Sequence, residues 1–151
     1  MAFGKFPQFT IVKTLNSSGT DEKIAAFTPD EDIELKYIYI YLLREGTEGG
    51  SETFQLKVYS NSAYTALVDS SDVVTYSTIK GGNNKHRIPF AFNRKMLQGG
   101  TTYYLEIVTT NYTRNGDTFY FGVLNETDPN YLTNGDTAVA GCAITHWLGY
   151  K

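Results

Sequence analysis

The fold is decided by one stretch of the chain, Ile33-Glu34-Leu35-Lys36-Tyr37-Ile38-Tyr39-Ile40-Tyr41-Leu42-Leu43. Polar and apolar residues alternate at its start, and apolar residues then occupy both alternating positions. This pattern predicts a strand that begins half-buried and ends covered on both faces, the central strand of a β-sandwich. Its β-branched and tyrosine residues argue against a helix. A strand places two sets of side chains on opposite faces: Tyr37, Tyr39 and Tyr41 on one, and Ile38, Ile40 and Leu42 on the other.

Shorter alternating segments lie on both sides of this strand, and turn signals recur roughly every 8–12 residues. No segment of about ten residues or more has a helical period, although residues 93–97 have room for one helical turn. The pattern predicts an all-β fold, an antiparallel β-sandwich or jelly roll of about eight to ten strands with little or no helix, in a single domain over residues 1–151. Four segments have clear inward positions: Phe54, Leu56 and Val58; Ile88, Phe90 and Phe92; Tyr103, Leu105 and Ile107; Phe119, Phe121 and Val123.

Two details of these segments carry further expectations. Pro89 has no amide hydrogen to donate, so the segment around it is expected at a sheet edge or a bulge. Glu34 and Glu106 occupy outward positions of predicted strands and are expected to face solvent.

Composition and charge exclude several classes of protein. The chain has 151 residues with 15% aromatic and 19% charged residues, which does not suit a disordered chain or a helical bundle. The net charge of −3 and the absence of a basic stripe argue against a nucleic-acid partner. No apolar run approaches the ~18 residues of a membrane helix, so no membrane partner is expected. The N-terminus lacks the apolar stretch of a signal peptide.

The residues that most often carry catalysis are few. Cys142 is the only cysteine, which excludes an internal disulfide, and the histidines are His86 and His146. Cys142 and His146 would lie roughly 13 Å apart on a strand, too far for a dyad. Asp30-Glu31-Asp32 offer the oxygen ligands that suit a calcium ion, but they lack the spacing of a calcium-binding loop, and a charged turn before the central strand is the alternative. No catalytic residue, metal site or cofactor is predicted, and the protein is not expected to be an enzyme.

Two groups of aromatic residues suggest binding surfaces. Phe3, Phe6 and Phe9 form an apolar N-terminal arm over residues 1–9, which docks either on its own domain or on a neighbouring subunit. Four tyrosines in or near loops either stack on sugar rings or cover the ends of the core: Tyr64, Tyr112, Tyr131 and Tyr150.

Several motifs occur in a familiar order. Phe27-Thr28-Pro29 precedes the central strand, Ile88-Pro89-Phe90-Ala91-Phe92 follows later, and Leu97-Gln98-Gly99-Gly100-Thr101-Thr102-Tyr103-Tyr104-Leu105 leads into another strand. Over residues 24–148 the chain resembles the carbohydrate-binding-module-like jelly-roll domains. Such domains occur on secreted bacterial enzymes and surface proteins, and similar jelly rolls occur as accessory proteins of phage particles.

The resemblance and the missing export signal together suggest a function. We expect a non-enzymatic phage virion structural protein, a capsid decoration or head auxiliary protein that is assembled in the host cytoplasm and resides in the virion. Its expected partners are the major capsid protein or other virion proteins, and it is expected to form a homo-oligomer. The alternative is a carbohydrate-binding module, or a glycan-binding adhesin or tail protein, that uses the loop tyrosines. A small hydrolase is a third alternative.

Overall fold

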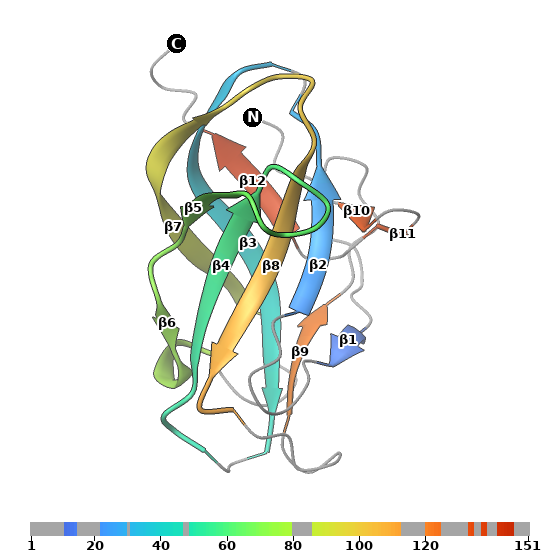
Figure 1. The fold of residues 1–151 in the computed structure, drawn as a ribbon. Coiled ribbons are helices and arrows are strands. Elements are labelled where there is room, and N and C mark those ends of the chain that lie inside the picture. Colours follow the sequence, from blue (N-terminus) through green and yellow to red (C-terminus); the bar gives the residue numbers. More distant parts are fainter. Residues whose placement is uncertain are drawn as a thin grey trace.

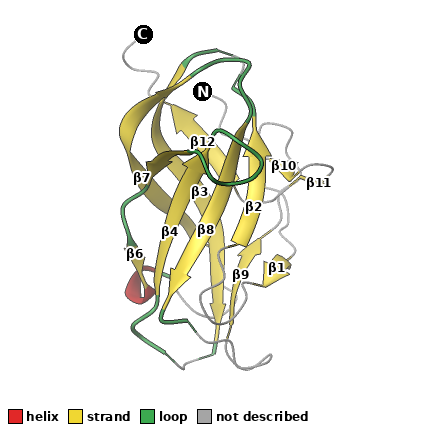
Figure 2. Cartoon of the chain, viewed as in Figure 1, coloured by secondary structure: helices red, strands yellow, loops and turns green. Residues whose placement is uncertain are grey.

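The computed structural model describes residues 11–14, 22–29, 31–46, 49–79, 86–112, 120–124, 133–134, 137–138 and 142–146. These residues are mostly β, and every strand pairing among them is antiparallel. They contain no α-helix, and their one helical segment is the short 3-10 turn η1 (Tyr76–Thr78) (Figure 2). The strands are β1 (Ile11–Thr14), β2 (Glu22–Phe27), β3 (Ile33–Glu45), β4 (Thr53–Tyr59), β5 (Leu67–Ser70), β6 (Val74–Thr75), β7 (His86–Leu97), β8 (Tyr103–Thr110), β9 (Tyr120–Leu124), β10 (Thr133–Asn134), β11 (Thr137–Ala138) and β12 (Cys142–His146).

The strands form two sheets. The five-stranded sheet has the order β1-β9-β3-β12, and β7 pairs along the other edge of β3. The seven-stranded sheet has the order β11-β10-β2-β8-β4-β5, and β6 also pairs with β4. In Figure 1, β2, β8 and β4 lie in front of β3, β7 and β12. The all-β, antiparallel prediction is therefore confirmed for the described residues.

The core is one cluster of buried side chains supplied by both sheets. Alternation along β4, β7 and β8 places the predicted residues inward, because successive side chains of a strand point to opposite faces. The confirmed inward residues are Phe54, Leu56 and Val58 on β4, Ile88, Phe90 and Phe92 on β7, and Tyr103, Leu105 and Ile107 on β8. The fourth predicted set, Phe119, Phe121 and Val123, falls on residues whose side chains lie outside the described part of the chain.

The long strand β3 changes its buried positions from odd to even numbers partway along its length. Its buried side chains are Ile33 and Leu35 in the first part and Ile38, Ile40 and Leu42 in the second. The change falls at Lys36, where the register shifts against both neighbours of β3. Leu35 and Tyr37 lie opposite Lys95 and Ala91 of β7, and opposite His146 and Thr145 of β12, so Lys36 is the extra residue of a bulge relative to β12. The second part was predicted to be covered on both faces, but Tyr39 is only half-buried on the outward side. The sequence of β3 therefore has apolar residues at both odd and even positions partly because the inward-facing positions change at the bulge.

The same bulge corrects the expectation of a helical turn at residues 93–97. These residues continue β7 as a strand to Leu97, and Arg94 takes up the extra length with a positive φ of 61°. Arg94 Nε lies 3.8 Å from Glu34 Oε1, whose side chain is 29% exposed. Pro89 lies on β7, opposite Tyr39 of β3. Among the described strands β7 pairs only with β3, so Pro89 lies on an edge strand, as its missing amide hydrogen predicted.

The segment from β5 to β6 links the two sheets along one side. The Asp72 amide donates to the Ala91 carbonyl of β7 (2.8 Å), and the Asn93 amide donates to Asp69 Oδ2 (3.2 Å). Between β5 and β6 the backbone does not pair regularly with β4. There the buried Ser71 supplies the acceptor instead, because its hydroxyl oxygen accepts a hydrogen bond from the Leu56 amide of β4 at 2.9 Å. The polar groups along this side are thereby hydrogen-bonded instead of being left as an open edge.

The turn before β8 explains several residues of the motif that runs from Leu97 to Leu105. The Gly99 amide donates to Asp32 Oδ1 at 2.8 Å, and a Cβ on Gly99 would lie 2.7 Å from Glu31 Cα. The Gln98 amide donates to the Tyr103 hydroxyl oxygen at 2.8 Å. This part of the motif therefore packs the turn at residues 97–103 against residues 31–32, and Asp32 serves in that contact.

Candidate functional site

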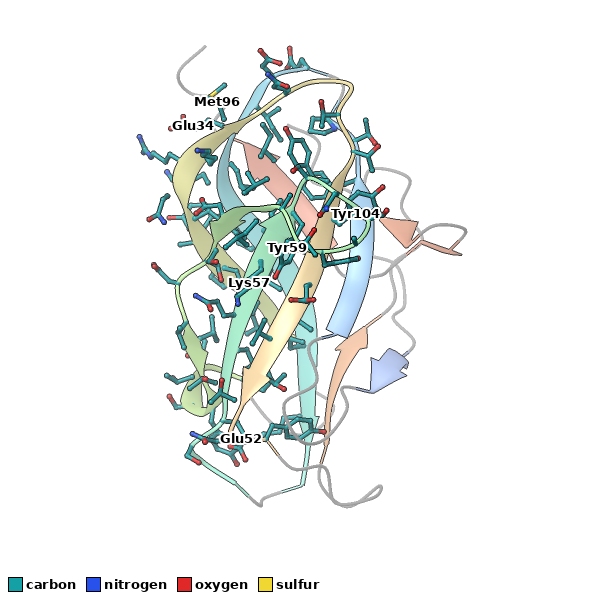
Figure 3. The ribbon with its side chains drawn as sticks, in the orientation of Figure 1. Glu34, Glu52, Lys57, Tyr59, Met96 and Tyr104 are labelled. Atoms are coloured by element: carbon teal, nitrogen blue, oxygen red, sulfur yellow. The ribbon has the colours of Figure 1, made fainter. Side chains whose placement is uncertain are left out.

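The candidate site lies on the outward face of the seven-stranded sheet, over β4 and β8. Because Leu56 and Val58 point inward, alternation places Lys57 and Tyr59 on the opposite face. The register of β4 with β8 places two pairs directly across from one another: Lys57 opposite Glu106, and Tyr59 opposite Tyr104. Figure 3 labels Lys57, Tyr59 and Tyr104 in this region.

The loop of residues 60–66 joins β4 to β5 and folds back over this face, crossing in front of β8 in Figure 1. The ring of Tyr64 in this loop lies 5.3 Å from the ring of Tyr59 and 5.8 Å from that of Tyr104, measured between centroids. We call these three residues the tyrosine cluster. Leu67, the cross-strand partner of Tyr59, borders it and is 54% exposed. Tyr64 and Tyr104 are half-buried, whereas Tyr59 is only 9% exposed, so the accessible ring surface comes mainly from Tyr64 and Tyr104, with Leu67 as its apolar margin.

Glu106 lies within this surface and corrects an expectation. Its outward position on β8 was predicted correctly, but its side chain is only 6% exposed and does not face solvent. The reason is that the Tyr59 hydroxyl donates a hydrogen bond to Glu106 Oε1 at 3.1 Å, in a region that the tyrosine rings cover. A buried carboxylate needs such donors, because a buried charge without partners is strongly destabilising.

The electrostatics of Tyr64 reflect the same environment. Burial raises the pKa of Tyr64 above its ordinary value of 10.0, and the charges of Glu106 and Tyr104 raise it further. The phenol therefore stays protonated at neutral pH and remains able to donate a hydrogen bond. The site combines a hydrogen-bond donor, an amphipathic ring surface and a carboxylate.

The other predicted binding residues do not join this site within the described structure. Tyr112 is 2% exposed and belongs to the core cluster, so it covers the end of the core instead of presenting a free ring face. Five of the predicted residues lie outside the described part of the chain: Phe3, Phe6, Phe9, Tyr131 and Tyr150.

The residues considered for catalysis are placed by their backbones alone. His86 lies on β7 opposite Leu42, and Cys142 and His146 lie at the two ends of β12, opposite Ile40 and Leu35. Within the described residues, no three His, Cys, Asp or Glu side chains gather closely enough to hold a metal ion. No described helix has the length and apolar character needed to cross a membrane.

Sequence reasoning singled out Tyr64 and missed Tyr59 and Tyr104 as members of the same cluster. Both residues occupy outward-facing positions of their strands, which the sequence indicates. That they lie side by side depends on the register of β4 with β8, which the sequence does not indicate. No protein-family model matches the chain, and no curated protein matches it.

Proposed function

We propose that the two antiparallel sheets form a β-sandwich of the jelly-roll kind, and that the protein acts by binding rather than by catalysis. The single buried cluster to which both sheets contribute supports the sandwich arrangement. The hydrogen bonds from the β5–β6 segment to β7 support it as well, because they join one sheet to the other along one side.

The function that this geometry supports best is carbohydrate binding at the tyrosine cluster. The observation that carries the proposal is the position of Tyr64, which is held over the sheet against Tyr59 and Tyr104 with a positive φ of 56°. A bulky residue rarely adopts this backbone conformation, and such strain tends to persist at functional sites. Tyrosine rings cover the apolar faces of sugars, and at this surface the hydroxyls of Tyr64 and Tyr104 and the neighbouring Lys57 would bond to sugar hydroxyls.

The angles between the rings limit the form of the ligand. Tyr64 is inclined by 60° to Tyr59 and by 63° to Tyr104, so the three rings do not share one plane. A flat crystalline polysaccharide that stacks on Tyr64 could not at the same time stack on Tyr59 or Tyr104. We therefore propose a single soluble carbohydrate chain as the ligand.

A glycan array probed at high protein density tests this proposal, with the hits confirmed by titration calorimetry. Tyr104→Ala should weaken any hit at least about tenfold, since aromatic contacts often dominate binding. Tyr37→Ala is the matched control, because Tyr37 is a half-buried tyrosine of β3, in the other sheet. The absence of any hit for the unmodified protein, or an equal loss with both variants, would refute carbohydrate binding at this surface.

A role as a phage virion structural protein is the second candidate, with the major capsid protein as its partner and a homo-oligomer as its working form. It is favoured by the sequence of the N-terminal arm, in which Phe3, Phe6 and Phe9 are too apolar to be left uncovered. The test is co-expression with the virion proteins encoded by neighbouring genes, followed by gradient sedimentation of the particles. The full chain should sediment with particles and a chain lacking residues 1–9 should not, whereas equal sedimentation of both would refute the role of the arm.

A further inference from the structure

Asn61, the second residue of the loop that carries Tyr64, makes four hydrogen bonds within that loop. Its side-chain Oδ1 accepts from the amides of Thr65 and Ala66, both at 3.0 Å. Its Nδ2 donates to Thr65 Oγ1 at 2.7 Å, and its own carbonyl accepts from the Tyr64 amide at 3.1 Å. The partners of Asn61 therefore lie on Tyr64 itself and on the two residues after it.

These bonds act at the point where the backbone is strained. Tyr64 has a φ of 56°, and left alone a tyrosine would relax to a negative φ, because its Cβ crowds the backbone in the left-handed region. The Asn61 carbonyl fixes the amide of Tyr64, and the Asn61 side chain fixes the two amides that follow. Asparagine suits this task, since its short side chain readily bonds to backbone amides a few residues ahead.

Ring packing alone does not account for the position of the loop. The neighbours of Tyr64 along the loop, Ser62, Ala63, Thr65 and Ala66, are all exposed and bury no apolar surface that would anchor the turn. The bond between the Ser60 amide and the Ala66 carbonyl at 2.9 Å closes the base of the loop, but it leaves the conformation at Tyr64 undetermined. The hydrogen bonds of Asn61 act directly on the backbone of Tyr64 and of the two residues after it.

We propose that Asn61 is the positioning residue of the binding surface, which sets the left-handed turn at Tyr64 and so holds the third ring of the tyrosine cluster in place. The consequence for ligand binding rests on the proposed carbohydrate function. Asn61 itself need not touch the ligand. It preorganises the surface, so that binding does not have to order the loop.

Two variants test this role. Asn61→Ala removes the acceptor for Thr65 and Ala66 and the donor to Thr65 Oγ1. Asn61→Asp is the conservative partner, because its carboxylate still accepts from both amides and can accept from the Thr65 hydroxyl in place of the lost donor. Both changes lie in a loop away from the core, and circular dichroism confirms that each variant is folded.

The first measurement is independent of any ligand. The pKa of Tyr64 is followed by the ultraviolet absorbance of tyrosinate, with Tyr64→Phe identifying its share of the titration. Tyr59, Tyr104 and Glu106 are the titratable groups that face it. Release of the ring in Asn61→Ala should lower the pKa of Tyr64 towards its ordinary value, and Asn61→Asp should keep it raised. An unchanged pKa in Asn61→Ala overturns the proposal.

The second measurement is affinity for the best glycan hit. Asn61→Ala should weaken binding about fivefold to tenfold, which corresponds to the loss of one or two net hydrogen bonds, and Asn61→Asp should stay within about twofold of the parent chain. If no glycan binds the parent chain, the carbohydrate function fails while the tyrosine titration still decides the role of Asn61. Full affinity in Asn61→Ala overturns the positioning role in binding.

Discussion

The hydrogen bond between Tyr59 and Glu106 gives the sharpest test of the outward face of the seven-stranded sheet. Tyr59→Phe removes only the hydroxyl that donates to Glu106 Oε1 at 3.1 Å and leaves the ring contacts intact. Glu106 is 6% exposed, so water cannot readily replace the lost donor. A buried hydrogen bond to a charged group contributes about 1.5 to 3 kcal/mol. Because Glu106 keeps other interactions, we expect the free energy of unfolding to fall by about 1 to 2 kcal/mol.

The assay is urea unfolding followed by circular dichroism, arranged as a double-mutant cycle with Glu106→Gln. A neutral glutamine oxygen accepts a weaker hydrogen bond than a carboxylate, so Tyr59→Phe should cost about 0.5 to 1 kcal/mol in the Glu106→Gln background. Tyr37→Phe, on the other sheet, is the matched control. A loss below about 0.5 kcal/mol in Tyr59→Phe, or an equal loss in both backgrounds, would refute the coupling of the two residues.

Three further predictions concern the core, the turn before β8 and alkaline pH. Phe54→Ala should lower the free energy of unfolding by about 3 to 5 kcal/mol, because Phe54 is fully buried; urea unfolding measures this, and a loss near 1 kcal/mol would contradict the tight core. Gly99→Ala should destabilise by about 1 to 3 kcal/mol, because its Cβ would lie 2.7 Å from backbone Glu31 Cα; thermal unfolding checks it, with Gly100→Ala (φ 74°) as the comparison for strain without a clash. Since the pKa of Tyr64 is raised in the folded state, its contribution to stability is present below the ordinary value of 10.0 and is lost as the pH rises through the folded pKa. Tyr64→Phe should therefore lose less stability than the parent chain between neutral and strongly alkaline pH, and parallel pH profiles would contradict the shift.

The strands and the inward residues could be predicted where pairing is regular. Along β4, alternation alone assigns Phe54, Leu56 and Val58 to the core, because a strand with one buried face has only two ways to point its side chains. The bulge between β3 and β7 could not be predicted. A strand with a bulge and a strand covered on both faces can have the same pattern of apolar residues in their sequences. For β3 the pairing distinguishes the two, because Leu35 lies opposite Lys95 while Tyr37 lies opposite Ala91.

The candidate site was predictable only in part, because exposure on an outward face depends on distant residues. The alternation along β8 shows that Glu106 points outward. Its burial depends on Tyr59 and on the loop that carries Tyr64, which come from other parts of the sequence. Tyr112 shows the converse case. It lies just beyond β8, next to the exposed Asn111 with its positive φ of 58°, yet its own side chain is only 2% exposed.

The pairing of β3 has a consequence for the order in which the protein is made. One edge of β3 is shared by β12 along residues 35–40 and by β9 along residues 42–45, and the other edge belongs to β7. All three partners follow β3 in the chain, and Ile40 pairs with Cys142. During synthesis β3 must therefore leave the ribosome long before its neighbours, with its backbone groups open to other chains. Such long-range pairing predicts slow folding. Among the described strands, β12 is made last, and it pairs with β3 along residues 35–40.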